Sequence, residues 1–383
     1  MTLGCRLNFA ESETLARMAP PGEDWTIVNS CAVTNEAVRQ TRQAIRRAHR
    51  QRPGAKILVT GCAAELEPEA FRAMAGVARV VGNFAKLSAW KSDAMPSPVP
   101  AGFQGKVRSF VAIQTGCDHR CTFCTIWQAR GASRTLPFEA VRDAIEREID
   151  RGAKEIVLTG VDITDVDGGI GRYCQRLLAA IPELKRLRLS SLDGVEMDDA
   201  LFELIAGEQR LMPHFHLSLQ AGDDMILKRM KRRHSRRDAV RTVERIKAAR
   251  PDATIGADLI AGFPTETEDM SLNSLKLLDD CDVIAAHIFP FSPRPDTAAA
   301  RMPQVSRELI KARAARLREA AAERRSRWLD GLVGSRLPVL VESGEKGHSD
   351  NFAPVAVPGA AKGATGQLRV TSRDDDHLVG VFA

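Results

Sequence analysis

The sequence predicts an α/β protein in three parts: a small parallel α/β unit, a longer series of strand–helix units, and a short β domain. Three observations support this. Short β-rich runs alternate with helical patterns over residues 1–92, the alternation restarts on a longer period over 107–305, and only short β-like runs remain over 331–383. With 383 residues, 44% of them hydrophobic, the chain is long enough for two or three domains.

The first part, residues 1–92, has three candidate strands at 25–30, 56–60 and 78–82. Helical patterns separate them, so the strands are expected to run parallel. The following segment, 93–106, contains three prolines and two glycines within "DAMPSPVPAGFQG" and is predicted to be a linker.

The second part, residues 107–305, repeats a strand–helix unit six times. One of its helices, at 137–152, begins near Pro137 and ends at Gly152. Six units are too few for a closed eight-stranded barrel and fit either a partial (β/α)6 barrel or an open doubly wound sheet. Ligands of both architectures bind at the carboxyl ends of the strands. The candidate strands are 110–114, 155–160, 186–191, 214–219, 254–260 and 283–289.

The end of the chain changes character twice. Residues 306–330 form a basic helical pattern, interpreted as a connector. Residues 331–383 contain four short β-like runs separated by Gly, Asp and Ser, which predicts a small β domain.

Several classes of protein are excluded by what the sequence lacks. No run approaches the ~18 apolar residues of a membrane helix, and the start has no signal peptide pattern, so we expect a cytoplasmic protein. Its eight cysteines should then be reduced, which favours metal or catalytic thiols over disulfides. Only four residues precede Cys5, leaving little room for a strand before it, as a truncated start would produce.

The formal net charge is +6, and many of the cations lie in three stretches, at 38–52, 227–237 and 306–327. In the first, arginines recur at helical spacing and define one cationic face, which suits a polyanion such as RNA or DNA. A solvated helix surface is the alternative for any single stretch. The candidate RNA-binding residues are Arg42, Arg46, Arg50, Lys231, Arg232 and Arg233.

The motif "GCDHRCTFC" places Cys117, Cys121 and Cys124 just after the first strand of the second part. Three such thiolates on a loop can hold an iron–sulfur cluster and leave one iron without a protein ligand. That iron can take the amino and carboxylate groups of S-adenosylmethionine (SAM), whose cleavage gives a 5′-deoxyadenosyl radical. The alternatives are a zinc site completed by His119, or unrelated thiols.

A second group of thiols is predicted in the first part. Cys5, Cys31 and Cys62 each follow a β-like run, and the carboxyl ends of parallel strands meet at one edge of a sheet. They would therefore meet as ligands of a second cluster, although scattered buried cysteines are also common. Cys174 and Cys281 are interpreted as core residues.

The phrases around these cysteines resemble those of the methylthiotransferases of the radical SAM superfamily, in the same order, over residues 2–305. "AVTN" after Cys31, together with "GFP" and "SPRPDT", is most similar to the branch that acts on N6-threonylcarbamoyladenosine. The other matching phrases are "TLGCRLNFAESE", "GCDHRCTFCTI", "LTGVDIT", "RLRLSSLD", "HLSLQAGDDMILKRMKRRH" and "HIFPFSPRPDTAAARM".

This resemblance implies a methylthiotransferase domain over 1–92, a radical SAM domain over 107–305, and a tRNA-gripping β domain of the TRAM type over 331–383. It also implies two 4Fe-4S clusters. The cluster on Cys117, Cys121 and Cys124 would generate the radical, and the cluster on Cys5, Cys31 and Cys62 would carry the sulfur. One SAM molecule would supply the methyl group and a second the radical.

The same resemblance locates the cofactor pocket. Phe123, before the last cysteine of the motif, is the usual residue beside the adenine of SAM. "LTGVD" stands where this superfamily usually has the turn for the methionine amino group. Later strand ends could reach the ribose or carboxylate, with ordinary strand-end capping as the alternative. The candidates are Thr159, Gly160, Asp162, Ser190, Ser191, Gln220 and Asp258.

The implied reaction converts N6-threonylcarbamoyladenosine at tRNA position 37 to its 2-methylthio derivative. The expected partners are tRNA and an electron donor such as flavodoxin or ferredoxin, and the protein is expected to be a monomer. Three alternatives stay open: methylthiolation of a ribosomal-protein aspartate, methylthiolation of isopentenyladenosine in tRNA, and a binding protein with degenerate cluster sites.

Overall fold

The N-terminal part is a three-stranded parallel sheet with helices on it. The computed structural model describes residues 1–89, 99–102 and 107–383. Strands β1 (Trp25–Ser30), β2 (Lys56–Gly61) and β3 (Val77–Val81) pair in that order. Thr2 adds one parallel bridge to Asn29 at the β1 edge. The helices are α1 (Arg6–Met18), α2 (Asn35–Gln51), α3 (Cys62–Leu66) and α4 (Pro68–Arg72).

The structure describes only part of the predicted linker, residues 93–106. Residues 93–98 and 103–106 lie outside the described residues. Between them, β4 (Ala101–Gly102) pairs antiparallel with β5 (Arg108–Ala112), so this piece of the expected linker extends the central sheet.

The central part is a partial barrel of parallel strands, and the predicted α/β fold class is confirmed. One sheet has the order β4-β5-β8-β9 and the next β10-β11-β12-β13, with Ser190 alone between β9 and β10. The remaining strands are β8 (Glu155–Thr159), β9 (Leu187–Leu189), β10 (Ser191–Leu192), β11 (His214–Gln220), β12 (Thr254–Ala261) and β13 (Val283–Pro290).

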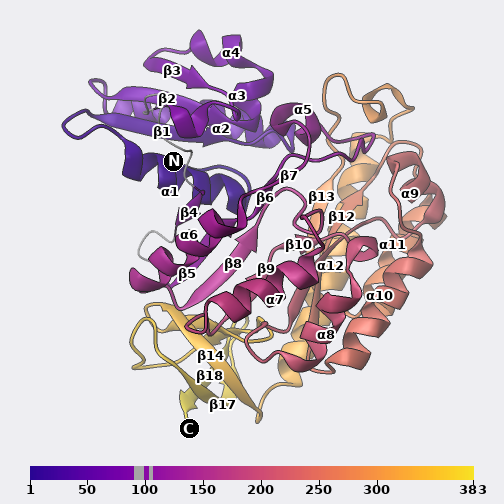
Figure 1. Cartoon of the computed structure of the whole chain (residues 1–383). Helices are drawn as coiled ribbons and strands as arrows, with labels where there is room; N and C mark the ends of the chain where they lie inside the picture. The colour runs from indigo at the N-terminus through magenta and orange to yellow at the C-terminus, as the bar shows by residue number, and fades with distance from the viewer. Residues whose placement is uncertain (90–98, 103–106) are drawn as a thin grey trace.

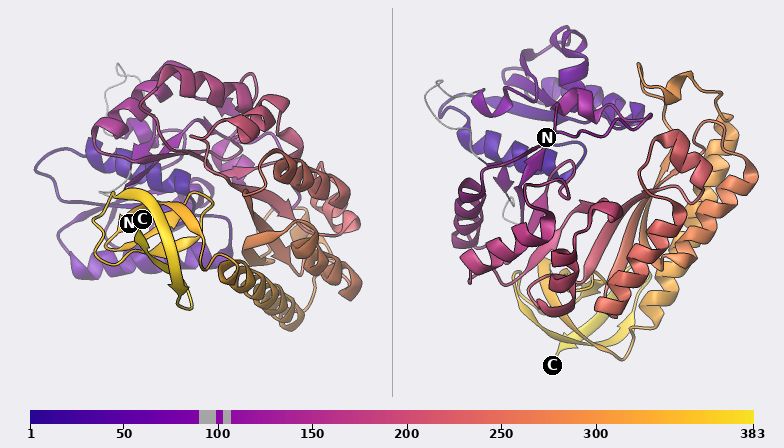
Figure 2. Two further views of the ribbon diagram at one scale, coloured as in Figure 1. Left: turned by 90° about the horizontal axis from the view of Figure 1, so that it is seen from below. Right: turned by 45° about the vertical axis from the view of Figure 1, so that its right-hand side comes forward.

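Helices cover the outer face of this partial barrel (Figures 1 and 2). Alternate strand residues such as Leu158, Leu217 and Leu259 point to the helices and form the main apolar core. Inward-facing positions of the same strands are largely polar, so the barrel interior is a site and not a core. The helices are α6 (Phe138–Asp150), α7 (Ile170–Ala180), α8 (Asp199–Gly207), α10 (Arg236–Ala249), α11 (Glu268–Asp280) and α12 (Arg307–Asp330).

Helix α12 differs from its interpretation as a basic connector, because it packs on β13, β12 and α11 as one more barrel helix. Its cations are used internally. Arg313 forms a buried ion pair with Glu266 at 3.0 Å, and Arg324 pairs with Asp282 at 2.9 Å. The helix therefore supplies fewer free charges than its sequence suggests.

The C-terminal part is a closed five-stranded barrel of order β14-β15-β16-β18-β17, one strand more than predicted. It lies against the amino-terminal ends of the central strands (Figures 1 and 2). Phe352 stacks on His214 of β11 at 4.7 Å, so this domain closes the lower end of the barrel. The strands are β14 (Arg336–Ser343), β15 (Lys346–Ser349), β16 (Pro354–Ala356), β17 (Thr365–Arg373) and β18 (Leu378–Phe382).

Candidate functional site

The three N-terminal cysteines meet at the carboxyl edge of the first sheet. Cys31 follows β1, Cys62 begins α3 directly after β2, and Cys5 is the residue before α1. Gly4 permits the approach: its φ is +100°, and a Cβ there would lie 2.9 Å from the Cys31 sulfur. Burial raises the pKa of Cys31 to about 11, and the neighbouring Cys5 and Cys62 raise it further. Such mutual repulsion is what a shared cation would relieve.

A buried ionic network lies against these thiols. Arg130, at the end of α5 (Ile126–Arg130), donates to Glu11 at 2.8 Å and to Asn8 Oδ1 at 2.8 Å. Lys86 forms a second ion pair with Glu11 and donates to Asn83 Oδ1 at 2.7 Å. Although burial opposes ionisation, the two cations hold the pKa of Glu11 at about 2. Two cations and one anion leave a positive charge beside the thiols.

The second thiol group follows the short hairpin of β6 (Gln114–Thr115) and β7 (Arg134–Thr135). Gly116 has φ +82°, and a Cβ there would lie 1.8 Å from the Ala132 carbonyl oxygen, so only glycine fits. Burial raises the pKa of Cys117 to about 12, and Cys124 and Cys121 contribute. The three thiols of this loop are therefore near enough to act on one another electrostatically.

The two thiol groups lie near one another. Burial raises the pKa of Cys124 to about 11, and the thiolates of both Cys121 and Cys62 raise it further. Asn83 links the two regions, because its amide contacts Cys62 Sγ at 3.6 Å and donates to the Ala129 carbonyl at 2.7 Å. The structure thus brings all six predicted cysteines to one region.

The loop after β13 also closes on the N-terminal part. The side chain of Asn35, at the start of α2, donates to the Pro293 carbonyl at 3.1 Å. Its backbone N–H donates to Ser292 Oγ at 3.2 Å, and Arg294 hydrogen-bonds its side-chain oxygen. The phrase "SPRPDT" therefore joins the last barrel strand to the sheet that carries Cys31.

Three of the residues predicted to bind SAM, namely Phe123, Thr159 and Gly160, lie in or near the segments around the second thiol group. Phe123 packs edge-on against Phe263 at 6.3 Å, within an apolar cluster that includes Ile260. Thr159 ends β8, and Gly160 is crowded by the Gln114 carbonyl at 2.9 Å from its ideal Cβ position. These residues form an apolar wall and a tight turn next to the cysteine loop.

Asp162 and His119 contact each other. His119 Nε2 lies 3.3 Å from Asp162 and 3.5 Å from Glu196. The hydrogen bond to Glu196 raises the pKa of His119, and burial together with Glu196 raises that of Asp162. The histidine considered as a fourth zinc ligand is therefore engaged by carboxylates, which weakens the zinc alternative.

Ser190 follows β9 and Gln220 ends β11, both at strand ends as expected, with Gln220 in a left-handed conformation at φ +66°. Ser191 instead begins the short strand β10. Asp258 does not lie at a strand end. It is the fifth residue of β12, in the middle of the strand, as its place within the predicted strand 254–260 already implied. His216 Nε2 and His287 Nδ1 lie 2.9 and 3.0 Å from its Oδ1 atom. Asp258 is thus an interior residue of the barrel, held between two imidazoles.

The candidate RNA-binding residues separate into two kinds. Arg46, Arg50, Lys231 and Arg233 are exposed. Arg42 pairs with Glu67 at 2.7 Å, and Arg233 pairs with Glu196.

Arg232 was expected on a cationic surface, but its side chain is only 8% exposed and pairs with Asp193 at 3.0 Å. Its guanidinium also approaches Cys121 Sγ at 3.9 Å. It belongs to the thiol region and is not available to a polyanion in solution.

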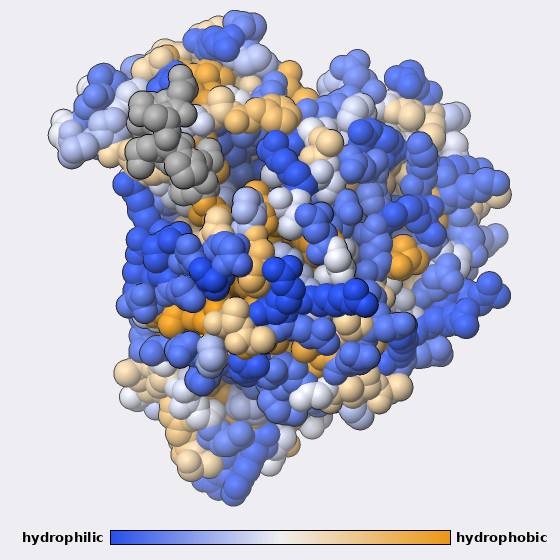
Figure 3. Space-filling view, viewed as in Figure 1, coloured by the Kyte–Doolittle hydropathy of each residue, from blue (hydrophilic) through white to orange (hydrophobic). Residues whose placement is uncertain are grey.

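Hydrophilic side chains cover most of the face shown in Figure 3.

Sequence reasoning missed the buried groups around the thiols: Asn8, Glu11, Lys86, Asn83 and Arg130. Two signals existed for them, since Asn8 and Glu11 follow Cys5 at helical spacing and Arg130 follows Cys124 within a helix turn or two. No local signal in the sequence indicated that Arg130 contacts Asn8 and Glu11, because more than 100 residues separate them along the chain.

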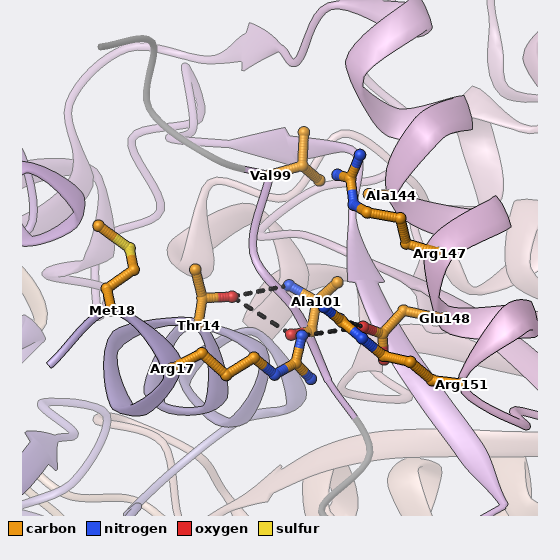
Figure 4. A pocket seen from close by; sticks show the side chains of 9 residues that line it. All are labelled: Thr14, Arg17, Met18, Val99, Ala101, Ala144, Arg147, Glu148 and Arg151. Atoms are coloured by element: carbon orange, nitrogen blue, oxygen red, sulfur yellow. Dashed lines mark hydrogen bonds and ion pairs between the residues drawn. The ribbon is translucent and has the colours of Figure 1, made fainter. Parts of the chain in front are cut away.

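One pocket lies away from the thiols, at the other end of α1. Thr14, Arg17 and Met18 line it from α1, opposite Val99 and Ala101 (Figure 4). Thr14 hydrogen-bonds the backbone of Ala101 in both directions, which fixes β4 against the helix. The pocket is a gap between packed elements and contains none of the predicted site residues.

Comparisons with known proteins agree with this geometry. Residues 111–278 match the radical SAM superfamily, and residues 1–82 match the uncharacterized protein family UPF0004. The threonylcarbamoyladenosine tRNA methylthiotransferase MtaB of Rickettsia prowazekii is 42% identical over 93% of this chain and 90% of its own length. The tRNA-2-methylthio-N(6)-dimethylallyladenosine synthase of Erythrobacter litoralis is 34% identical over 89% of this chain and 85% of its own.

A solved structure shares the fold. The radical S-adenosylmethionine methyltransferase TsrM from Kitasatospora setae superposes with a TM-score of 0.56 at 15% identity, covering 76% of this chain and 68% of its own. Within the described residues, no helix is long and apolar enough to cross a membrane.

Proposed function

Because the chain belongs to the radical SAM methylthiotransferases, we propose that it converts N6-threonylcarbamoyladenosine at tRNA position 37 to its 2-methylthio derivative. The chain is a tRNA methylthiotransferase, a transferase of alkylthio groups. The observation that carries the proposal is the meeting of two groups of three cysteines beside a barrel interior. The relative named for threonylcarbamoyladenosine is more similar to this chain than the relative named for dimethylallyladenosine, at 42% against 34% identity.

The reaction needs radical chemistry, because the C2–H of adenine is weakly acidic and carries no leaving group. The residues present fit two 4Fe-4S clusters: each group offers three thiols without disulfide partners, and buried cations stand beside them. When bound, the clusters and SAM would supply a 5′-deoxyadenosyl radical and a methylated sulfur.

The chain's own residues prepare this chemistry. Cys117, Cys121 and Cys124 would hold one cluster with an open iron, and Cys5, Cys31 and Cys62 the other. Phe123 would pack against the adenine of SAM. Around it, the polar strand ends would hold the methionine and ribose groups; these are Thr159, Gly160, Asp162, Ser190, Ser191 and Gln220. Asp258 would act from within the barrel and not from a strand end.

The proposal extends to the organisation of the protein and its partners. Residues 1–92 would deliver sulfur, 107–305 would generate the radical, and 331–383 would help to hold tRNA. We further propose a cytoplasmic monomer that receives electrons from a flavodoxin or ferredoxin. Arg46, Arg50 and Lys231 are the exposed cations that would contact phosphates.

The test is mass spectrometry of nucleosides from total tRNA of cells with and without the gene. We expect the deletion to remove 2-methylthio-N6-threonylcarbamoyladenosine while N6-threonylcarbamoyladenosine accumulates. Loss of the 2-methylthio derivative of isopentenyladenosine instead would move the protein to that substrate. An unchanged tRNA profile would contradict both and direct the search to ribosomal proteins.

Iron content tests the two-cluster arrangement. Anaerobically reconstituted protein should hold about eight irons, and a variant with Cys5, Cys31 and Cys62 all changed to Ala should hold about four. Replacing the buried Cys174 by Ala is the matched control and should leave the iron content unchanged. About four irons in the unaltered protein would contradict the second site.

A further inference from the structure

Arg6 is a cation on the barrel side of α1 that forms no ion pair with any carboxylate of the described residues. It is the first residue of α1 and directly follows Cys5. Its guanidinium carbon lies 5.9 Å from the centre of the Phe110 ring, on the inner face of β5. Within the described residues, Arg6 makes no hydrogen bond and no ion pair.

The carboxylates near Arg6 are already occupied. Glu155 of β8 accepts from Arg188 at 2.9 Å and from Arg186 at 3.1 Å. Asp258 of β12 lies between His216 and His287, as described above. Glu155 and Asp258 act on Arg6 only at longer range, so neither is its partner.

The position of Arg6 is electrostatically unfavourable in the protein alone. Arg108 and Arg188 lie close enough to repel its charge. A cation at the N-terminus of a helix is also disfavoured by the helix dipole. An anion bound between these groups would offset both effects, because it attracts each guanidinium and is favoured by the helix N-terminus.

Arg6 faces the barrel and not the thiols. The cation that acts on Cys5 is Arg130, whereas the groups that act on Arg6 belong to four different barrel strands: Arg108, Glu155, Arg188 and Asp258. Since these strands surround the interior, the guanidinium projects toward the space that they enclose. A counter-charge for the N-terminal cluster is therefore provided by Arg130 and Lys86.

We propose that Arg6 binds the carboxylate on the N6 substituent of the substrate nucleoside and so selects a threonylcarbamoyl group over an uncharged alkenyl group. This inference rests on the proposed function and names a specificity residue for it. A guanidinium binds a planar carboxylate through two parallel hydrogen bonds, which fits a charged substituent and offers nothing to an isopentenyl chain. Because Cys5 and Arg6 are adjacent, the same turn of chain would hold the sulfur-carrying cluster and orient the base before it.

The experiment compares two anticodon stem-loops on the reconstituted holoenzyme. One carries N6-threonylcarbamoyladenosine, and the other carries its threonine carboxamide, which has the same shape without the charge. We expect the unaltered enzyme to favour the carboxylate on the order of 100-fold in kcat/KM. R6Q should lose most of this preference through a raised KM for the carboxylate substrate, while its activity on the carboxamide stays similar. R6K should retain part of the preference, because lysine keeps the positive charge but lacks the two parallel N–H donors of the guanidinium.

Controls separate this role from others. R142Q removes a guanidinium that is paired on the outer surface of α6 and should leave the preference intact. Equal use of both stem-loops by the unaltered enzyme would overturn the inference, even if R6Q failed to fold. So would an equal loss on both substrates in R6Q, or a raised KM for SAM in that variant.

Failure of the proposed function gives a different result. In that case the unaltered enzyme would modify neither threonylcarbamoyl stem-loop and would modify one that carries isopentenyladenosine. That outcome would also overturn the role of Arg6, since no substrate carboxylate would remain for it to bind.

Discussion

At the scale of single residues, Arg130 joins two parts of the protein that the chain connects only distantly. It comes from α5, six residues after Cys124, and its ion pair with Glu11 places it against the N-terminal thiols. Arg130 is 3% exposed, so its buried positive charge is stabilised by the carboxylate of Glu11 and not by water. An ion pair of this kind is costly to break from one side, because the remaining charge is left without its partner.

Replacing Arg130 by Met should therefore destabilise the protein by about 3–5 kcal/mol and reduce iron binding at Cys5, Cys31 and Cys62. Guanidinium unfolding and iron analysis measure the two effects. The double variant R130M/E11Q removes both partners and should cost less than the sum of the single changes. Additive losses would mean that the pair is not coupled.

At the scale of elements, the basic helices differ in what their charges do. Helix α12 uses Arg313 and Arg324 to bind the barrel beneath it, so its basic pattern serves packing. Helix α2 keeps Arg46 and Arg50 exposed, while Ile45 and Ala48 bury its other face against the sheet. A cationic pattern in sequence identifies a basic helix and does not say which of its charges remain free.

Changing Arg46 and Arg50 to Ala should lower the steepness of the salt dependence of tRNA binding. Each lost phosphate contact on a double-stranded region reduces the slope of log K against log salt by about 0.9, so the double variant should lose about 1–2. Filter binding over a salt series measures it. The variant R142A/R245A, which removes two paired arginines from outer barrel helices, should keep the original slope. An unchanged slope in R46A/R50A would remove α2 from the interface.

At the scale of the whole molecule, the C-terminal β domain is fixed to the barrel by an ionic network and not by apolar contact alone. Arg186 pairs with both Glu155 of the barrel and Asp350 of the β domain, and Arg108 pairs with Glu342 at 2.6 Å. The domain thereby closes the end of the barrel opposite the thiols.

This network predicts a pH dependence of stability. Despite burial, Arg188, Arg108 and Arg186 hold the pKa of Glu155 at about 2. Since this pKa is lower than the ~4.3 of an unfolded chain, the contribution of Glu155 is complete above about pH 4.3. It is then lost as the pH falls toward 2.

The stability difference between the unaltered protein and E155Q should consequently be constant from pH 5 to 8, at about 3–5 kcal/mol, and shrink below pH 4. Guanidinium unfolding of the cluster-free protein measures it. E139Q, an exposed change on α6, should show little difference at any pH. A difference that persists unchanged at pH 3 would contradict the assignment.

Much of the fold could be predicted because its signals are local. All six central strands and the three N-terminal strands fall where alternation and apolar runs predicted them. The cysteines could be grouped because the carboxyl ends of parallel strands share one edge. Asp258 was assigned to a strand end although the predicted strand 254–260 already places it two residues before the end, and β12 extends only one residue further.

The sequence by itself determined the fold class, the order of the parts and the residues able to hold clusters, because strand and helix periods and cysteine spacing are properties of neighbouring residues. Only the tertiary structure decided which charges are free. Arg232 was predicted to be a surface cation and is buried, whereas Arg6, for which the sequence predicted no role, makes no ion pair within the part of the chain that the structure describes. The physical reason is that a charge is neutralised by whatever packs against it, and those partners lie tens to hundreds of residues away along the chain.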